Sequence, residues 1–116
     1  MAETTSIIIF GASGDLSHRK LIPALFNLYL KKRLPEKFHI FGTATRNWTD
    51  ADLQQTCRNS LLEESGRTFN EKAWDEFSQR ISYRSGNFSD AETFTQLETE
   101  FEKTENGPAN RLYYLA

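Results

Sequence analysis

Two glycines, a serine, an acid and several bases follow a short apolar segment near the N-terminus. The segment is Ile7-Ile8-Ile9-Phe10, and the glycines are Gly11 and Gly14. Glycine lets the main chain approach a ligand closely, because it has no side chain and accepts backbone angles that other residues avoid. The N–H groups that begin a following helix can then bind an anion. The pattern predicts a phosphate-binding turn between a strand and a helix.

The spacing of this turn is G-x-x-G-x-x-S, which differs from the common dinucleotide fingerprint G-x-G-x-x-G at Ser13 and Leu16. An ordinary tight turn would accommodate the same two glycines. The flanking segments favour the phosphate site, because an apolar strand precedes the turn and a long apolar helix follows it. We therefore predict that the N–H groups of Ser13, Asp15 and Leu16 hold a pyrophosphate within the loop Gly11-Ala12-Ser13-Gly14-Asp15-Leu16.

The longer run from Phe10 to Leu16, continued by Arg19-Lys20-Leu21 and Pro23-Ala24-Leu25, resembles the start of glucose-6-phosphate dehydrogenases. Later segments resemble the same family in order, namely Gly42-Thr43-Ala44, Arg58-Asn59-Ser60-Leu61 and Asn110-Arg111-Leu112-Tyr113-Tyr114-Leu115-Ala116. The resemblance implies an enzyme of the pentose phosphate pathway that oxidises glucose 6-phosphate to the lactone and passes hydride to NADP. It also implies that the family's catalytic His/Asp pair and sugar-phosphate-binding bases come later than the segments seen here.

The resemblance also gives roles to charged residues after the turn. Lys20 matches the lysine that in this family reaches the junction of coenzyme and substrate, although a solvated charge is the alternative. An ammonium at that place would orient charge without titrating. Asp15 is expected to stabilise the helix N-terminus and hold the loop rather than touch phosphate. His18 and Arg19 are expected at the surface.

A second candidate site follows the predicted strand at 38–41. An NAD site usually has Asp or Glu at this point, whereas a 2′-phosphate requires a base. Residues 42–47 contain no acid, and Arg46 can hold a phosphate through two hydrogen bonds. We therefore predict NADP as the coenzyme, with NAD as the alternative. The family's usual arginine aligns with Thr45, one place earlier, so the strength of this preference stays open.

A third candidate pair is Asn87 and Phe88, which follow the predicted strand at 81–85. The family often has Asp and an apolar residue there, close to the adenine. Asn87 can hydrogen-bond a base and Phe88 can pack on it. The alternative is a loop asparagine beside a buried phenylalanine.

These residues require an alternation of strands and helices. The sequence predicts strands at 6–10, 38–41, 81–85 and 111–115, with helices at 21–30, about 50–64, after Asn70, and after a capping box at 89–92 that carries Phe94, Leu97 and Phe101. The fold class is therefore α/β, a Rossmann-like doubly wound parallel sheet of order 3-2-1-4. With about four strands, residues 1–116 are expected to form an incomplete NADP-binding domain, and the family's substrate and catalytic domain is absent.

The helix at 21–30 carries no charge and is apolar on all sides. We expect it to be buried on more than one side, with Pro23 in its first turns. Where the rest of the parent enzyme is absent, Ile22, Phe26 or Tyr29 would be exposed. Self-association of the isolated chain, through this helix or the fourth strand, is the expected result.

Composition indicates a globular protein without a nucleic-acid or membrane partner. The 116 residues are 38% hydrophobic and 26% charged, and the formal net charge is −2. The single cysteine, Cys57, is expected in the core. Without a signal peptide or an apolar span, a cytoplasmic location is expected. For the parent enzyme we expect glucose 6-phosphate as substrate and a homo-oligomer.

Two further interpretations stay open. The chain can be a stand-alone nucleotide-binding module without catalysis, or part of another nucleotide-dependent enzyme with the same fold. Neither His18 nor His39 matches the family's catalytic motif, and no Cys/His cluster predicts a metal site. The 116-residue chain is therefore expected to be inactive by itself.

Overall fold

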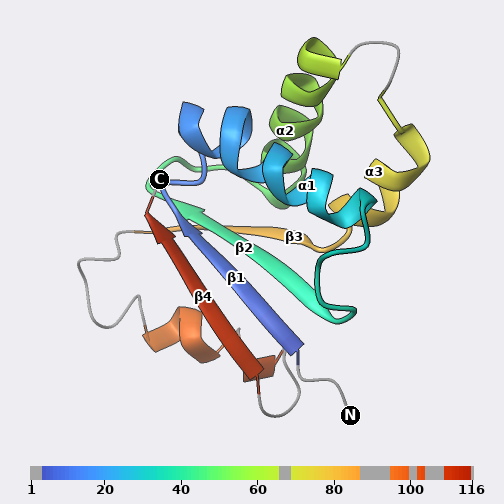
Figure 1. Ribbon diagram of the computed structural model, residues 1–116. Coiled ribbons are helices and arrows are strands. Elements are labelled where there is room, and N and C mark those ends of the chain that lie inside the picture. Colours follow the sequence, from blue (N-terminus) through green and yellow to red (C-terminus); the bar gives the residue numbers. More distant parts are fainter. Residues whose placement is uncertain (1–3, 66–68, 87–94, 100–101, 104–108, 116) are drawn as a thin grey trace.

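The computed structural model describes residues 4–65, 69–86, 95–99, 102–103 and 109–115. The described strands form one parallel sheet in the order β3-β2-β1-β4 (Figure 1). Their bounds are β1 (Thr4–Phe10), β2 (Phe38–Ala44), β3 (Ile81–Ser85) and β4 (Ala109–Leu115). The predicted fold class and strand order are confirmed.

Helical layers cover both faces of the sheet (Figure 1). One face carries a π-helical turn η1 (Ser17–Leu21) and the helices α1 (Ile22–Leu30), α2 (Asp50–Ser65) and α3 (Glu71–Ser78). The described helical residues between 95 and 103 lie on the other face. Side chains of β1 alternate between the layers, because Ile7 and Ile9 join the cluster under α1–α3 while Ile8 packs with Phe41 and Leu97. The predicted capping box at 89–92 lies outside the described residues.

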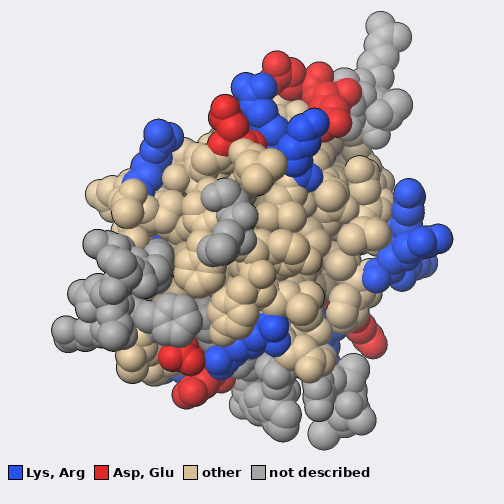
Figure 2. Space-filling view, turned by 60° about the vertical axis from the view of Figure 1, so that its left-hand side comes forward, with Lys and Arg blue, Asp and Glu red and all other residues tan. Residues whose placement is uncertain are grey.

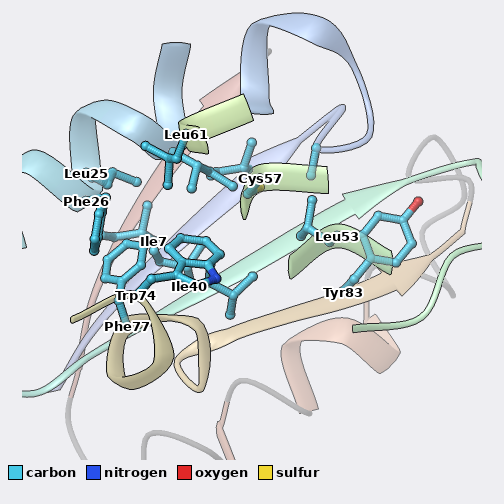
Figure 3. Packing of buried hydrophobic residues seen from close by; sticks show 14 of the residues in the cluster. Ile7, Leu25, Phe26, Ile40, Leu53, Cys57, Leu61, Trp74, Phe77 and Tyr83 are labelled. Atoms are coloured by element: carbon cyan, nitrogen blue, oxygen red, sulfur yellow. The ribbon is translucent and has the colours of Figure 1, made fainter. Parts of the chain in front are cut away.

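The larger core lies between the sheet and α1–α3 (Figure 3). An aromatic cluster fills its centre, with the Phe26 ring 5.5 Å from that of Trp74 and 5.2 Å from that of Phe77. Cys57 is completely buried in this core, as predicted, and burial raises the pKa of its thiol to about 12. A thiol with such a pKa stays protonated at neutral pH and is a poor nucleophile.

The helix after the glycine turn has Asp15 at its N-terminus, as predicted. Helical structure starts at Asp15, and η1 runs directly into α1. In η1 the Ile22 N–H donates to the Ser17 carbonyl, five residues back. Pro23 lies in the first turn of α1, as expected from its missing N–H. The π turn before Pro23 was not predicted, because the apolar pattern carries no sign of such an irregularity.

Burial of α1 differs from the prediction. Ile22, Pro23, Leu25 and Phe26 are buried, whereas Leu28 is 38% and Leu30 is 42% exposed. The helix is therefore buried on one side and not on several, and the expected exposure of Ile22 and Phe26 is wrong. The reason is that the residues at i, i+3 and i+4 form one stripe that faces the sheet and α3.

Strand β4 forms an edge of the described sheet. Its side chains Leu112, Tyr113 and Tyr114 are between 39% and 48% exposed. Figure 2 brings this side of the molecule forward and shows a broad area with few charged side chains, bordered by Lys, Arg, Asp and Glu. An edge strand pairs readily with another chain, because its outer N–H and C=O groups can continue the ladder of the sheet.

We therefore expect the 116-residue chain to self-associate through β4. Light scattering over a dilution series should show a mass that falls with concentration, and hydrogen exchange should show β4 amides that gain protection on association. Tyr113→Lys should shift the association to higher concentration, because a charge on an edge strand opposes pairing. A monomer at every concentration, with protected β4 amides, would contradict this expectation.

Within the part of the chain that the structure describes, no helix combines the length and the apolar character needed to cross a membrane.

Candidate functional site

The predicted phosphate loop is hydrogen-bonded to the end of β2. The Gly11 N–H and the Ala12 N–H both donate to the Thr43 carbonyl, at N···O distances of 2.7 and 3.1 Å. Gly11 has a φ of 80°, a conformation that favours glycine. The Gly14 N–H closes the turn on the Gly11 carbonyl at 3.0 Å. The loop is therefore built by main-chain contacts to a buried strand.

Gly14 lies in a crowded part of this turn. A Cβ atom at Gly14 would lie 3.3 Å from the Gly11 oxygen, a tight contact within the turn itself, so the turn favours glycine there. The Ala12 side chain is buried in the core, so it packs the loop against the sheet and helices. The N–H groups of Ser13, Asp15 and Leu16 precede or begin the helix, where the first N–H groups have no intrahelical acceptor. Their binding of phosphate stays a prediction.

Asp15 and His18 connect the loop to α2. The His18 Nε2 atom lies 3.2 Å from Asp15 Oδ1, and its Nδ1 atom lies 2.7 Å from Ser60 Oγ. The His18 side chain is only 14% exposed, so the expected surface position is wrong. Because helical structure begins at Asp15, residues 15 and 18 lie one turn apart on the side that faces α2. Arg19 is 63% exposed, as expected.

Lys20 is exposed and lines a hollow of about 280 Å³ between η1 and α2. The other lining residues are Arg19, Ser60, Glu63 and Glu64. The structure thus groups Lys20 with two acids of α2 and not with the residues after β2. Its predicted contact with substrate and coenzyme stays a prediction.

The second candidate site lies just beyond β2, which extends to Ala44, past its predicted end. Thr45, Arg46 and Asn47 are all exposed. The Arg46 guanidinium carbon lies 5.2 Å from the centre of the Trp48 ring, within the range of a cation–π contact. The structure therefore holds the Arg46 side chain over an aromatic ring at the carboxyl edge of the sheet.

A capping box starts α2 directly after this loop. The Asp52 N–H donates to Thr49 Oγ1 at 3.2 Å, and the Thr49 N–H donates to Asp52 Oδ2 at 2.8 Å. The predicted helix start is confirmed. Because the Asp52 carboxylate accepts the Thr49 N–H, the capping box fixes the C-terminal end of the loop that follows β2.

Three residues that the sequence analysis did not select, Trp48, Tyr83 and Arg84, line an open hollow of about 480 Å³ at the ends of β2 and β3. Asp50 belongs to the same hollow, and its Oδ1 accepts the Tyr83 N–H at 2.7 Å and lies 3.5 Å from Arg84 Nη1. The hollow therefore combines two aromatic side chains with one base, Arg84, and one acid, Asp50, beside the exposed loop. The predicted adenine contacts, Asn87 and Phe88, lie outside the described residues.

Each histidine lies within hydrogen-bonding distance of a serine side chain. His18 is held between Asp15 and Ser60, and His39 Nε2 lies 2.9 Å from Ser82 Oγ. Burial lowers the pKa of His39, with Arg80 and Arg84 adding to the effect and Asp50 opposing it. His39 is therefore neutral in the folded chain at neutral pH.

This lowered pKa predicts a loss of stability in acid. In the unfolded chain His39 has its ordinary pKa near 6.5, so as the pH falls below this value His39 is protonated in the unfolded chain before it is protonated in the folded chain. The contribution of neutral His39 to the free energy of unfolding is fully present above about pH 6.5. It is lost as the pH falls through the lower pKa that His39 has in the folded chain. Thermal unfolding from pH 7.5 to 5 should show a smaller decline for His39→Gln than for the parent chain. His18→Gln is the matched control, and an unchanged decline in His39→Gln would contradict the expectation.

Comparisons with known proteins agree with this geometry. A family model described as "Glucose-6-phosphate dehydrogenase, NAD binding domain" matches residues 8–116. The chloroplastic glucose-6-phosphate 1-dehydrogenase of Nicotiana tabacum is 40% identical over 120 residues, which cover 97% of this chain and 19% of the relative. The cytoplasmic glucose-6-phosphate 1-dehydrogenase 5 of Arabidopsis thaliana is 39% identical over 118 residues, covering 96% of this chain and 23% of the relative.

A solved structure of a glucose-6-phosphate dehydrogenase in complex with glucose 6-phosphate superposes with a TM-score of 0.88 at 34% identity. The match covers 99% of this chain and 24% of the solved chain. This chain therefore spans about a fifth to a quarter of the length of these relatives.

Proposed function

This chain belongs to the glucose-6-phosphate dehydrogenase family, and we propose that it forms the coenzyme-binding start of an enzyme that oxidises glucose 6-phosphate with NADP. In this proposal residues 1–116 are an incomplete coenzyme domain, and further residues supply the substrate site and the general base. The reaction is the one that opens the pentose phosphate pathway.

The single observation that carries the proposal is the meeting of two anion-binding features at the end of β2. The Thr43 carbonyl holds the glycine loop, and Arg46 follows β2 by two residues. In parallel α/β sheets, ligands bind beyond the carboxyl ends of the strands, where the strand order reverses. Here that point lies between β1 and β4.

The residues present fit an NADP molecule. In this proposal the N–H groups of Ser13, Asp15 and Leu16, at the start of the helix, hold the pyrophosphate. Arg46 then reaches the 2′-phosphate, with the Trp48 ring behind its guanidinium. When bound, NADP supplies the acceptor for hydride. The chain's own residues bind and orient the coenzyme.

Other predicted contacts complete this assignment. Thr45 and the pair Asn87 and Phe88 are proposed to line the 2′-phosphate and adenine, and Lys20 to approach the substrate. A homo-oligomer and a cytoplasmic location complete the proposal for the whole enzyme. One of the relatives above is named cytoplasmic and another chloroplastic, and cell fractionation distinguishes the two.

The stand-alone module is less favoured than this proposal, because the relatives named above are glucose-6-phosphate dehydrogenases. Turnover distinguishes the two interpretations. The 116-residue chain with glucose 6-phosphate and NADP should give no rise in NADPH absorbance, whereas the product of the complete gene should. A stand-alone module would give no NADPH, either as the 116-residue chain or as the product of the complete gene. Steady turnover by the pure 116-residue chain would overturn the assignment of the general base to later residues.

Coenzyme binding is tested on the ¹⁵N-labelled chain by titration with NADP, NAD and adenosine monophosphate. NADP should shift the amide signals of residues 11–16 and 45–48, and NAD should shift the first group more than the second. Adenosine monophosphate, which has no pyrophosphate, should leave residues 11–16 nearly unchanged. No saturable shift at the glycine loop, or shifts only around the hollow beside Lys20, would contradict the proposed site.

A further inference from the structure

Tyr83, in the middle of β3, connects the two candidate subsites. Its side chain is 2% exposed, and its ring centre lies 5.9 Å from that of Trp48. Figure 3 shows the Tyr83 ring beside Leu53, with the hydroxyl directed away from the labelled core residues. The ring thus belongs to the core, while the hydroxyl reaches the loop that follows β2.

The hydroxyl makes two contacts with the proposed site. It donates to the Arg46 carbonyl at an O···O distance of 2.6 Å, and the Ser13 side chain also hydrogen-bonds it. Burial raises the pKa of Tyr83, with Ser13 and Arg46 opposing the rise. The group therefore stays protonated and remains a donor at neutral pH.

These contacts hold a segment that lies outside the regular secondary structure. Residues 45–48 belong to no helix or strand, and Arg46 and Asn47 are exposed. The Arg46 carbonyl accepts the Tyr83 hydroxyl and the Trp48 N–H, the latter at 2.9 Å. The same hydroxyl contacts Ser13, which belongs to the glycine loop. The Tyr83 hydroxyl oxygen therefore lies between the glycine loop, which is proposed to bind pyrophosphate, and the loop that carries Arg46.

We propose that the Tyr83 hydroxyl is a positioning group for coenzyme discrimination, which holds the main chain at Arg46 and so sets the reach of its guanidinium to a 2′-phosphate. This inference rests on the proposed function. It predicts that loss of the hydroxyl weakens NADP binding and leaves NAD binding nearly unchanged, because NAD has no 2′-phosphate.

The test is Tyr83→Phe, which keeps the buried ring and removes only the hydroxyl. Calorimetric titration of the 116-residue chain should show NADP binding weakened by about two- to tenfold, the range for one hydrogen bond. NAD binding should change by less than the lower end of that range. Tyr29→Phe is the matched control, because the Tyr29 hydroxyl donates to Glu76 Oε2 at 3.3 Å and lies outside the proposed site.

A double-mutant cycle with Arg46→Ala shows whether Tyr83 acts through Arg46. In the Arg46→Ala background, Tyr83→Phe should have no further effect on NADP binding. Equal losses for NADP and NAD, or an undiminished effect in that background, would overturn the positioning role while leaving the proposed function intact. NADP binding that is insensitive to Arg46→Ala would overturn both.

A second measurement needs no substitution at Tyr83 and so does not depend on how that variant folds. NADP should slow hydrogen exchange of the Trp48 amide, which shares the Arg46 carbonyl with Tyr83, more than NAD does. Equal slowing by both coenzymes would contradict the proposal.

Discussion

Gly42→Ala is expected to lower the free energy of unfolding by about 1–3 kcal/mol, the usual effect of overpacking a core. A Cβ atom at Gly42 would lie 2.6 Å from Leu53 Cδ2 and 2.7 Å from Ala12 Cβ. Leu53 is completely buried, and the Ala12 N–H is bonded to the Thr43 carbonyl, so neither neighbour moves easily. Chemical denaturation measures the loss.

The same substitution should weaken coenzyme binding, because Ala12 belongs to the glycine loop and must shift. Ala12→Gly removes one of the two clashing atoms and is the matched partner. In the double variant the loss of unfolding free energy should be smaller than the sum of the two single losses. Additive losses would show that the added methyl is accommodated elsewhere, and unchanged NADP binding would show that the loop does not follow Ala12.

Arg46→Ala is expected to weaken NADP binding by about 1.5–3 kcal/mol, the range for a hydrogen bond to a charged group. NAD binding should be nearly unchanged, because the 2′-phosphate is the only part of NADP that NAD lacks. Titration calorimetry of both coenzymes gives the two values. The exposed Arg33, which follows α1, provides the control Arg33→Ala.

Equal losses for the two coenzymes would instead mean that Arg46 supports the loop through its contact with Trp48. Thr45→Arg tests the same idea in the opposite direction, because Thr45 is exposed and directly precedes Arg46. The added base should strengthen NADP binding and restore part of what Arg46→Ala loses. Failure to restore any NADP preference would show that the 2′-phosphate does not approach residues 45 and 46.

Local features of the chain predicted most of the fold. The unbroken apolar run of β1 indicated a strand covered on both faces, and the structure places Ile7 and Ile8 in different clusters. Helix starts were predictable because capping residues act within one turn. Asn70 Oδ1 accepts the Ala73 N–H at 3.1 Å, as its position before α3 indicated.

Contacts between residues distant in sequence were not predictable. Ser60 lies 42 residues after its partner His18, and Tyr83 lies 37 residues after Arg46. Tyr83 alternates with polar residues along β3, which is the pattern of a core residue, and nothing local shows which group its hydroxyl contacts. The π turn of η1 was likewise not indicated by the local sequence pattern.

The proposed phosphate loop is held by main-chain atoms, whereas the proposed coenzyme-selecting residues act through their side chains. The Thr43 carbonyl holds Gly11 and Ala12 through the main chain, and the Thr43 hydroxyl donates to the Arg84 carbonyl at 2.8 Å. Thr45, Arg46 and Asn47 contribute exposed side chains beyond this support. Substitutions at these three positions therefore leave the Thr43 contacts in place. If these residues bind the coenzyme as proposed, the preference for NAD or NADP can drift between lineages, or be redesigned, separately from the binding of pyrophosphate.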